Sequence, residues 1–207
     1  VLVPALRKSN AVLETLVTSD GVSGIAGARK GGFKGASTDL GSIWNNSEIN
    51  AVVIGTRHNR HAEEVMLALN SGRHVFVEKP LALTLEEINE IEAAYHTQWR
   101  TGKNLILMVG FNRRFAPLVR TIKALLDTKV QPKSIIYTVN AGSLPQDHWI
   151  GDPKVGGGRI VGEVCHFVDI IRHLVGFPIQ SFQAINPIPS SHIAMGKEER
   201  ATINLVF

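Results

Sequence analysis

Apolar runs and helical segments alternate along the first half of the chain, and this alternation restricts the fold more than any other feature. The apolar runs are residues 11–17, 51–56, 74–78 and 104–111. Residues 61–72 have helical spacing and a glycine stop, and Thr84 with Glu87 forms a capping box that starts a second helix. Runs without polar alternation are typical of strands covered on both faces. The βαβαβ order therefore predicts an α/β fold with a parallel sheet and helices on both faces.

The second half follows a different pattern. It contains predicted helices at 115–127 and 161–175 and predicted strands at 134–142, 179–186 and 201–207. Strands joined by long excursions predict an α+β domain with an open-faced, mostly antiparallel sheet. We therefore expect two domains, 1–113 and 114–207. Residues 1–9 resemble the middle of a helix, and residues 201–207 resemble a strand without a terminal turn. We therefore expect both domains to be incomplete, with the first parallel strand lying before residue 1.

The composition argues against several classes of protein. The net charge is +4, but no run of basic residues accompanies it, which argues against a nucleic-acid surface. Cys165 is the only cysteine, which excludes an internal disulfide framework and a cysteine-rich zinc site and favours a reducing, cytoplasmic compartment. No apolar stretch of about 18 residues occurs, so the sequence predicts no membrane span.

Polar side chains follow three of the predicted parallel strands. They are Thr56, Arg57, His58, Asn59, Glu78, Lys79, Asn112, Arg113 and Arg114. Ligands of doubly wound sheets bind beyond the carboxyl ends of the strands. A single polar loop is usually only solvated, but three such loops on one rim favour a binding site.

The glycine fingerprint of dinucleotide-binding folds does not occur in the sequence. Gly-x-Gly-x-x-Gly lets the backbone approach a pyrophosphate at a helix N-terminus. The glycines of 21–35 have other spacings, and Val161 occupies the third-glycine position of GGGRIVG. A helix under way at residue 1 would place the fingerprint just before the chain. The acidic residue that meets the adenine ribose would then be Asp20, or Ser19 beside it, at the end of a strand. An ordinary Asp-Gly turn is the alternative.

Three segments together carry a resemblance to a known family. They read HVFVEKPLALT (74–84), GFNRRFAP (110–117) and GGGRIVGEVCHFVDIIRHLVG (156–176). In this order they resemble the Gfo/Idh/MocA oxidoreductases over nearly the whole chain. The resemblance implies a Rossmann domain followed by an α/β domain with a large open-faced sheet, and NAD or NADP as cofactor. It also implies oxidation or reduction of a sugar or cyclitol carbon, and a homo-oligomer (dimer or tetramer) formed through the C-terminal sheet.

The resemblance assigns catalytic roles to Lys79 and His166. Lys79 would lie beside the reacting carbon and hydrogen-bond the substrate oxygen or move its proton, and its bond to Pro80 is often cis in the family. A solvated lysine at a strand end is the alternative. His166 would exchange a proton near neutral pH. It falls off the apolar stripe of its helix, so it is not an expected core residue, and a solvated helix face is the alternative.

Gly162 marks a departure from the family pattern. The family has an aspartate four residues before the histidine, whereas here the carboxylate is one place later, at Glu163. Glu163 lies one helical turn from His166 and would help to select its tautomer. The altered arrangement leaves room for a different or weaker reaction.

The remaining site residues are expected in two groups. The cofactor group comprises Ser19, Asp20, Thr56, His58, Asn59, His61, Glu78 and Lys79. The substrate group comprises Arg114, Asn140, His148, Trp149 and Asp169. Trp149 suits stacking on a sugar face as well as it suits packing. The spacing of Glu163, His166 and His173 is compatible with zinc or iron, but a single polar helix face is usually only solvated, and we predict no metal.

These features predict an NAD(P)-dependent oxidoreductase. It would transfer a hydride between nicotinamide and a secondary alcohol of a sugar, cyclitol or similar polyol. Three alternatives remain open: an NAD-dependent glycosidase of the same family, a non-catalytic sugar- or nucleotide-binding module, and a metal-dependent isomerase or lyase.

Overall fold

A computed structural model describes residues 2–145, 147–185 and 200–207 of the chain. Its strands are β1 (Thr15–Val17), β2 (Gly35–Ser37), β3 (Ala51–Ile54), β4 (His74–Val77), β5 (Leu107–Val109), β6 (Ser181–Ile185) and β7 (Thr202–Val206). Its α-helices are α1 (Leu2–Leu6), α2 (Gly21–Gly31), α3 (Gly41–Trp44), α4 (His61–Asn70), α5 (Leu85–Arg100), α6 (Pro117–Asp127) and α7 (Cys165–Val175). Shorter turns are the 3₁₀-helices η1 (His58–Arg60), η2 (Asn112–Phe115) and η3 (Trp149–Gly151) and the π-helical turn η4 (Ile160–Val164).

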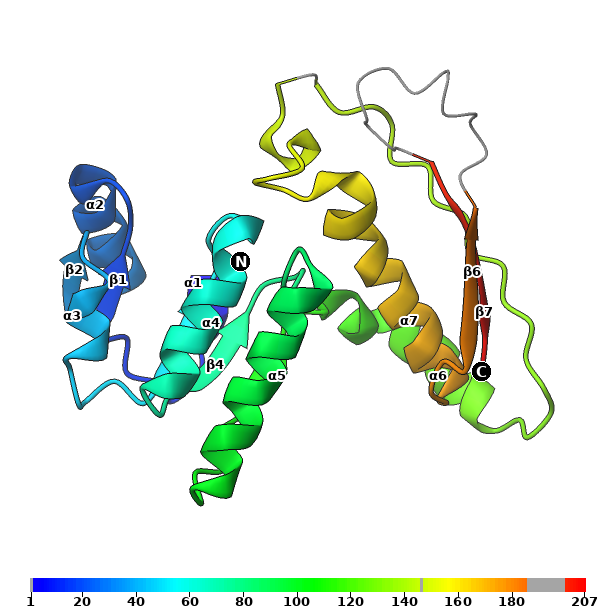
Figure 1. Cartoon of the computed structure of the whole chain (residues 1–207), viewed down its shortest axis with the longest axis horizontal. Helices are drawn as coiled ribbons and strands as arrows, with labels where there is room; N and C mark the ends of the chain where they lie inside the picture. The colour runs from blue at the N-terminus through cyan, green and yellow to red at the C-terminus, as the bar shows by residue number, and fades with distance from the viewer. Residues whose placement is uncertain (1, 146, 186–199) are drawn as a thin grey trace.

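The strands form two parallel sheets and one small antiparallel sheet. β1 pairs with β2, and β4 lies between β3 and β5 in the second parallel sheet. β6 and β7 form the antiparallel pair at the far end of the molecule (Figure 1). The parallel arrangement confirms the predicted α/β class. The strands are shorter than predicted, because only residues with a hydrogen-bonded neighbour join a sheet; the run at 11–17 contributes only β1.

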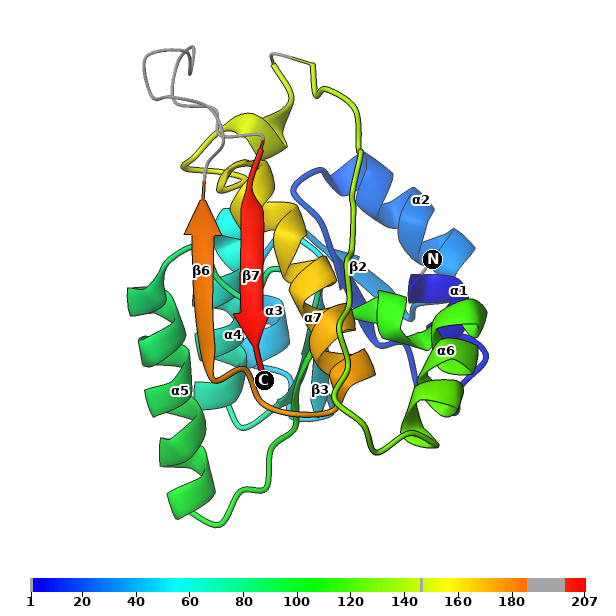
Figure 2. The same ribbon diagram turned by 90° about the vertical axis from the view of Figure 1, so that its right-hand side faces the viewer.

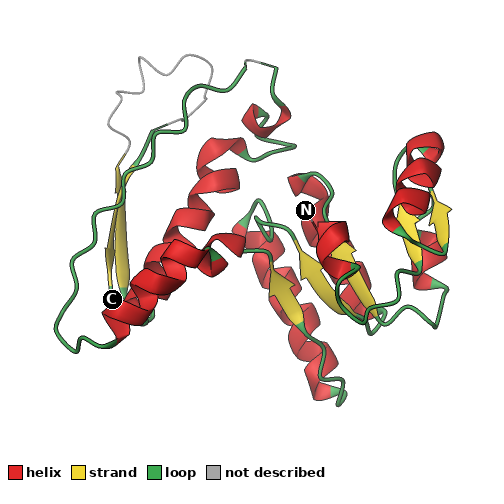
Figure 3. Ribbon diagram, turned by 180° about the vertical axis from the view of Figure 1, so that it is seen from behind, coloured by secondary structure: helices red, strands yellow, loops and turns green. Residues whose placement is uncertain are grey.

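The core lies between the β3–β4–β5 sheet and the helices α4 and α5. Its members are Ile43, Val52, Ile54, Ala62, Val65, Ala68, Leu69, Val75, Val77, Ala82, Ile91 and Leu105. The opposite face of the same sheet is open among the described residues, since Val53 is 42% exposed and Met108 45%. In Figure 3 the strands of this sheet face the viewer and α5 lies behind them. Helices α4 and α5 cover one face of this sheet, and the prediction of helices on both faces is not confirmed within the described residues.

Helix α2 was not predicted, because glycines normally disfavour helices. Here they allow the helix to approach β1 closely. A Cβ at Gly24 would lie 2.4 Å from Thr18 Oγ1, and one at Gly27 would lie 3.1 Å from Leu16. Asp20 starts the helix by accepting hydrogen bonds from the backbone N–H groups of residues 22 and 23.

The second half is built around the helix pair α6 and α7. The predicted strand at 134–142 is absent; these residues carry no assigned secondary structure and run past α7 outside the three sheets (Figure 2). Ile136 in this segment is 93% exposed, which indicates that no described strand covers it. The predicted mostly antiparallel sheet therefore reduces to β6 and β7 within the described residues. The predicted strand at 179–186 ends at residue 186, outside the described residues. No helix of the described part is long and apolar enough to cross a membrane.

Candidate active site

Lys79 and Glu163 form an ion pair that joins the two halves of the chain. Lys79 follows β4, and its bond to Pro80 is cis, as the family resemblance implies. Its Nζ donates to Glu163 Oε1 at 2.8 Å and to Gly162 O at 3.0 Å. Gly162 and Glu163 lie on the π-helical turn η4, a kind of turn that often occurs at functional sites. The side chains are 14% and 29% exposed, so the pair is partly shielded from water.

His166 lies in the first turn of α7 and is buried, with only 5% of its surface exposed. It is not a member of the hydrophobic core, as predicted, but the alternative of a solvated helix face is wrong. The sequence pattern of one helix does not reveal burial by another part of the chain, here the loop of Phe111, whose ring centroid is 6.3 Å from the imidazole. Nδ1 has no hydrogen-bond partner among the described residues. Burial lowers the pKa of His166, and the positive charges of Lys79 and Arg113 lower it further, so the ring is neutral at pH 7.

Glu163 was expected to hydrogen-bond the imidazole of His166, and it does not. Its carboxylate pairs with Lys79, and its charge only partly offsets the lowering of the His166 pKa. The carboxylate therefore holds the lysine rather than selecting the tautomer of the histidine.

Arg114 and Asp169 bond to each other. Arg114 Nε donates to Asp169 Oδ2 at 3.0 Å, and Nη2 donates to the other carboxylate oxygen. Asp169 is 7% exposed, and its hydrogen bonds raise the pKa of Arg114. The pair connects η2 to α7 one turn after His166. Both predicted substrate ligands therefore have their charges paired within the protein.

His58 and Trp149 form a second contact between the two halves. His58 Nδ1 lies 2.8 Å from Gly156 O, and the Trp149 ring meets the His58 ring edge-on with centroids 4.7 Å apart. Asn59 N–H also donates to Val155 O at 3.1 Å. The pKa of His58 is lowered, chiefly by burial. Trp149 therefore packs on η1, which matches the packing alternative.

His61 is fully buried and connects two strand ends. Its Nδ1 lies 2.7 Å from Pro80 O, and its Nε2 lies 3.0 Å from Thr56 O. Thr56 in turn donates its hydroxyl to Glu64 at 2.9 Å. His61 therefore fixes the loops that follow β3 and β4 and takes a positioning role in the rim.

Asp20 remains at the exposed end of β1, next to Ser19. Its hydrogen bonds to Ser23, followed by that to Val22, lower the pKa of its carboxyl, so the group is ionised at neutral pH. Its backbone is extended and its side chain caps α2, so Asp20 and Gly21 begin a helix rather than form an Asp-Gly turn. An N-cap carboxylate at a strand end nevertheless keeps lone pairs available to a ligand. Glu78 follows β4 and is half-buried.

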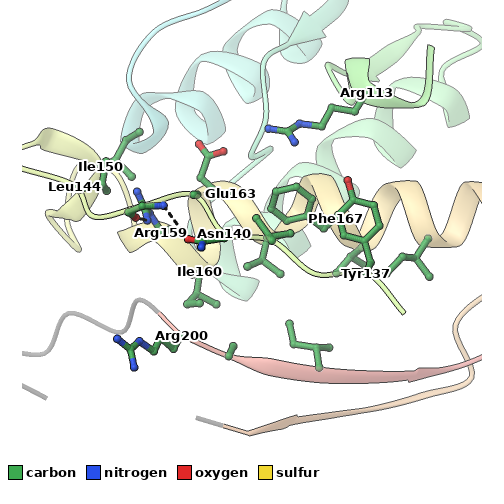
Figure 4. A pocket seen from close by; sticks show the side chains of 18 of the residues that line it. Arg113, Tyr137, Asn140, Leu144, Ile150, Arg159, Ile160, Glu163, Phe167 and Arg200 are labelled. Carbon is green, nitrogen blue, oxygen red and sulfur yellow. Dashed lines mark hydrogen bonds between the residues drawn. The ribbon is translucent and has the colours of Figure 1, made fainter. Parts of the chain in front are cut away.

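A cavity of about 900 Å³ lies between α7, the segment 137–144 and β7 (Figure 4). Of the predicted substrate residues, Asn140 lines it and Arg114, His148, Trp149 and Asp169 do not. Glu163 also lines it, so the cavity reaches the ion pair with Lys79. Sequence reasoning placed Arg113 on the predicted binding rim but missed two further arginines that line the cavity, Arg159 and Arg200. No group of three potential metal ligands occurs within the described residues.

Comparisons with known proteins identify a matching family and several relatives. A family model described as "Oxidoreductase family, NAD-binding Rossmann fold" (GFO_IDH_MocA) matches residues 5–111. Levoglucosan dehydrogenase of Pseudarthrobacter phenanthrenivorans is 31% identical over 177 residues, 80% of this chain and 42% of that protein. The scyllo-inositol 2-dehydrogenase (NAD(+)) of Bacillus subtilis is 34% identical over 157 residues, 74% of this chain and 43% of that protein. The chain thus spans less than half the length of these two relatives.

A solved structure has the same fold. Levoglucosan dehydrogenase in complex with NADH and levoglucosan superposes with a TM-score of 0.78 at 24% identity, covering 95% of this chain and 55% of that one. The superposition includes both halves of the chain, so α6, α7 and the β6–β7 pair follow the parallel sheets in a known arrangement.

Proposed function

The chain belongs to the Gfo/Idh/MocA oxidoreductase family with an NAD-binding Rossmann fold, and from this premise we propose that it oxidises a secondary alcohol of a sugar, cyclitol or similar polyol. The names of the two relatives specify an anhydrosugar and an inositol as substrates of those proteins. The observation that carries the proposal is the Lys79–Glu163 ion pair between the two halves of the chain, with the buried His166 three residues after Glu163.

The proton of the alcohol is the part of the reaction that the residues of this chain manage. Two acceptors fix the Lys79 amine, which leaves its remaining N–H for the alcohol oxygen. His166 is neutral and buried, and a ring nitrogen can accept the hydroxyl proton as negative charge develops on that oxygen. Glu163 keeps the amine in place throughout. The nicotinamide, when bound, supplies the hydride acceptor.

The residues at the strand ends fit such a dinucleotide. Doubly wound sheets hold dinucleotides beyond the carboxyl ends of their strands, where Ser19, Asp20, Thr56 and Asn59 lie. The ionised carboxylate of Asp20 suits the two hydroxyl groups of an unphosphorylated ribose and repels a 2′-phosphate, so we propose NAD rather than NADP. His58 and His61 hold these loops in place through their contacts with Gly156 O and Thr56 O.

We propose the division into a nucleotide-binding domain, 1–113, and a substrate and oligomerisation domain, 114–207. β1 and β3 belong to separate parallel sheets among the described residues, as expected if a strand that pairs with both lies before residue 1. Three apolar side chains of the β6–β7 pair, Phe182, Ile185 and Val206, are 75%, 48% and 54% exposed, which supports a homo-oligomer through this sheet. The single cysteine supports a cytoplasmic location.

The test is a screen of the full-length protein with NAD and a panel of sugars and cyclitols, read by absorbance of the reduced nicotinamide. Lys79→Met should abolish turnover while NADH binding, read by fluorescence, is retained. Hydrolysis of a glycoside without net reduction of NAD would indicate the glycosidase instead. NADH and polyol binding without any turnover would indicate a binding module.

A further inference from the structure

The cavity next to the Lys79–Glu163 pair has a strongly cationic wall. Arg113 enters it from η2, Arg159 from the glycine-rich loop before η4, and Arg200 from the residues that precede β7 (Figure 4). The volume of about 900 Å³ falls within the roughly 300–1,000 Å³ that small-molecule sites span. These three positive charges lie around one cavity, so they favour the binding of an anion inside it.

The carboxylates of the described residues do not neutralise the positive charge of this wall. Among the described residues that line the cavity, Glu163 is the only acidic one, and its charge is paired with Lys79 at 2.8 Å. No ion pair of Arg113, Arg159 or Arg200 occurs within the described part of the chain. The described residues that line the cavity therefore carry a net positive charge, which an anionic ligand would neutralise.

The arginines are held in a way that leaves hydrogen-bond donors for a ligand. Arg159 donates one N–H to Gly142 O, and a guanidinium has five N–H donors in all. Arg113 lies over the Phe167 ring, with its guanidinium carbon 4.8 Å from the centroid, and its side chain donates no hydrogen bond to another described residue. Apolar neighbours such as Tyr137 and Leu144 lower the local dielectric and strengthen charge interactions.

We propose that the substrate is an anionic polyol, a sugar or cyclitol that bears a carboxylate or phosphoryl group bound by Arg113, Arg159 and Arg200. Guanidinium groups bind both kinds of anion through paired hydrogen bonds. Because Glu163 borders the cavity and also holds Lys79, a polyol with its reacting hydroxyl at Lys79 would extend its anionic group toward the arginines. This inference rests on the proposed function, since it names the substrate class of that same site.

The experiment compares matched neutral and anionic probes on the full-length protein. D-glucose, D-glucuronate and D-glucose 6-phosphate, and D-galactose with D-galacturonate, are tested for kcat/KM with NAD and for calorimetric binding in the presence of NADH. An anionic member should exceed its neutral partner at least tenfold in kcat/KM and in affinity. A higher value for the uronates identifies a carboxylate site, and a higher value for the phosphate identifies a phosphoryl site.

Variants test whether these arginines produce the preference. Arg159→Gln and, separately, Arg200→Gln should each reduce the ratio of anionic to neutral kcat/KM about 10- to 100-fold, mainly through KM, as expected for a hydrogen bond to a charged group. Arg172→Gln, which removes an exposed charge from α7 outside the cavity, is the matched control and should leave the ratio unchanged.

The outcomes separate this inference from the proposed function. If neutral sugars are oxidised as well as the acids, or if neither arginine variant changes the ratio, the anionic substrate is refuted and the oxidoreductase stands. If no probe is oxidised, the oxidoreductase fails, and calorimetry still decides the inference. In that case tighter binding of the anions that is lost in Arg159→Gln supports it, and equal binding of glucose and glucuronate refutes it.

Discussion

Replacing Glu163 by glutamine removes one charge from the ion pair with Lys79 and leaves its shape almost unchanged. The carboxylate accepts from Nζ at 2.8 Å, and both side chains are less than a third exposed. A hydrogen bond to a charged group contributes about 1.5–3 kcal/mol. Glutamine still offers a neutral acceptor, so the lower half of that range applies. A loss of about 1.5–2 kcal/mol lowers kcat/KM roughly 10- to 30-fold.

The same substitution also moves the pH profile in a defined direction. The negative charge of Glu163 raises the pKa of His166, against the larger effects of burial and of Lys79 that lower it. Without that charge the imidazole becomes a weaker base. Because the reaction needs the neutral ring, activity falls as pH drops through this pKa, and in Glu163→Gln the fall should occur at a lower pH than in the unmodified protein.

The assay is kcat/KM for polyol oxidation between pH 4.5 and 9, as an approximate working range around the ordinary histidine pKa. Glu90→Gln removes an exposed charge from α5 and should leave both the rate and the profile unchanged. A kcat/KM within twofold of normal for Glu163→Gln would show that Glu163 does not hold Lys79. An acid limb displaced to higher pH would show that the charge of Glu163 does not raise the pKa of His166.

Three further substitutions test other parts of the site. Asp20→Ser keeps an N-cap oxygen but removes the charge, so the ratio of kcat/KM for NADP to that for NAD should rise about tenfold or more; an unchanged ratio would remove Asp20 from the cofactor site. Asp169→Ala leaves Arg114 without its partner and should lower the free energy of unfolding by about 2–3 kcal/mol in denaturant titration, somewhat less than for a fully buried pair. Gly156→Ala places a Cβ 2.3 Å from the backbone of Ile150 in η3, and should displace this loop and lower the melting temperature. Gly55→Ala, with no atom within 4 Å, should have little effect.

The sequence predicted those parts of the fold that depend on local patterns. The capping box of Thr84 and Glu87 is formed as expected, with the side chain of each accepting from the backbone of the other. Helices α4, α6 and α7 lie where periodicity indicated them, with the π-helical turn η4 at the start of the last. The resemblance to the family also predicted the cis bond after Lys79.

Features that depend on contacts between distant segments were not predictable. The segment 134–142 has strand-like residues, but a strand also needs a hydrogen-bonded neighbour. His166 is buried by residues of the other half, which no helical periodicity encodes. The pairing of Lys79 with Glu163 depends on the contact between the two halves, and Arg113, Arg159 and Arg200 line one cavity only in the folded chain.

The position of a bound alcohol oxygen is the most direct test of the proposed reaction. A crystal structure of the full-length protein with NADH and a polyol that it oxidises would give the distances from that oxygen to Lys79 Nζ and to the nearer ring nitrogen of His166. We predict that both lie within hydrogen-bond reach, about 2.6–3.2 Å. A polyol bound away from Lys79, or the two nitrogens facing separate regions of solvent, would contradict it.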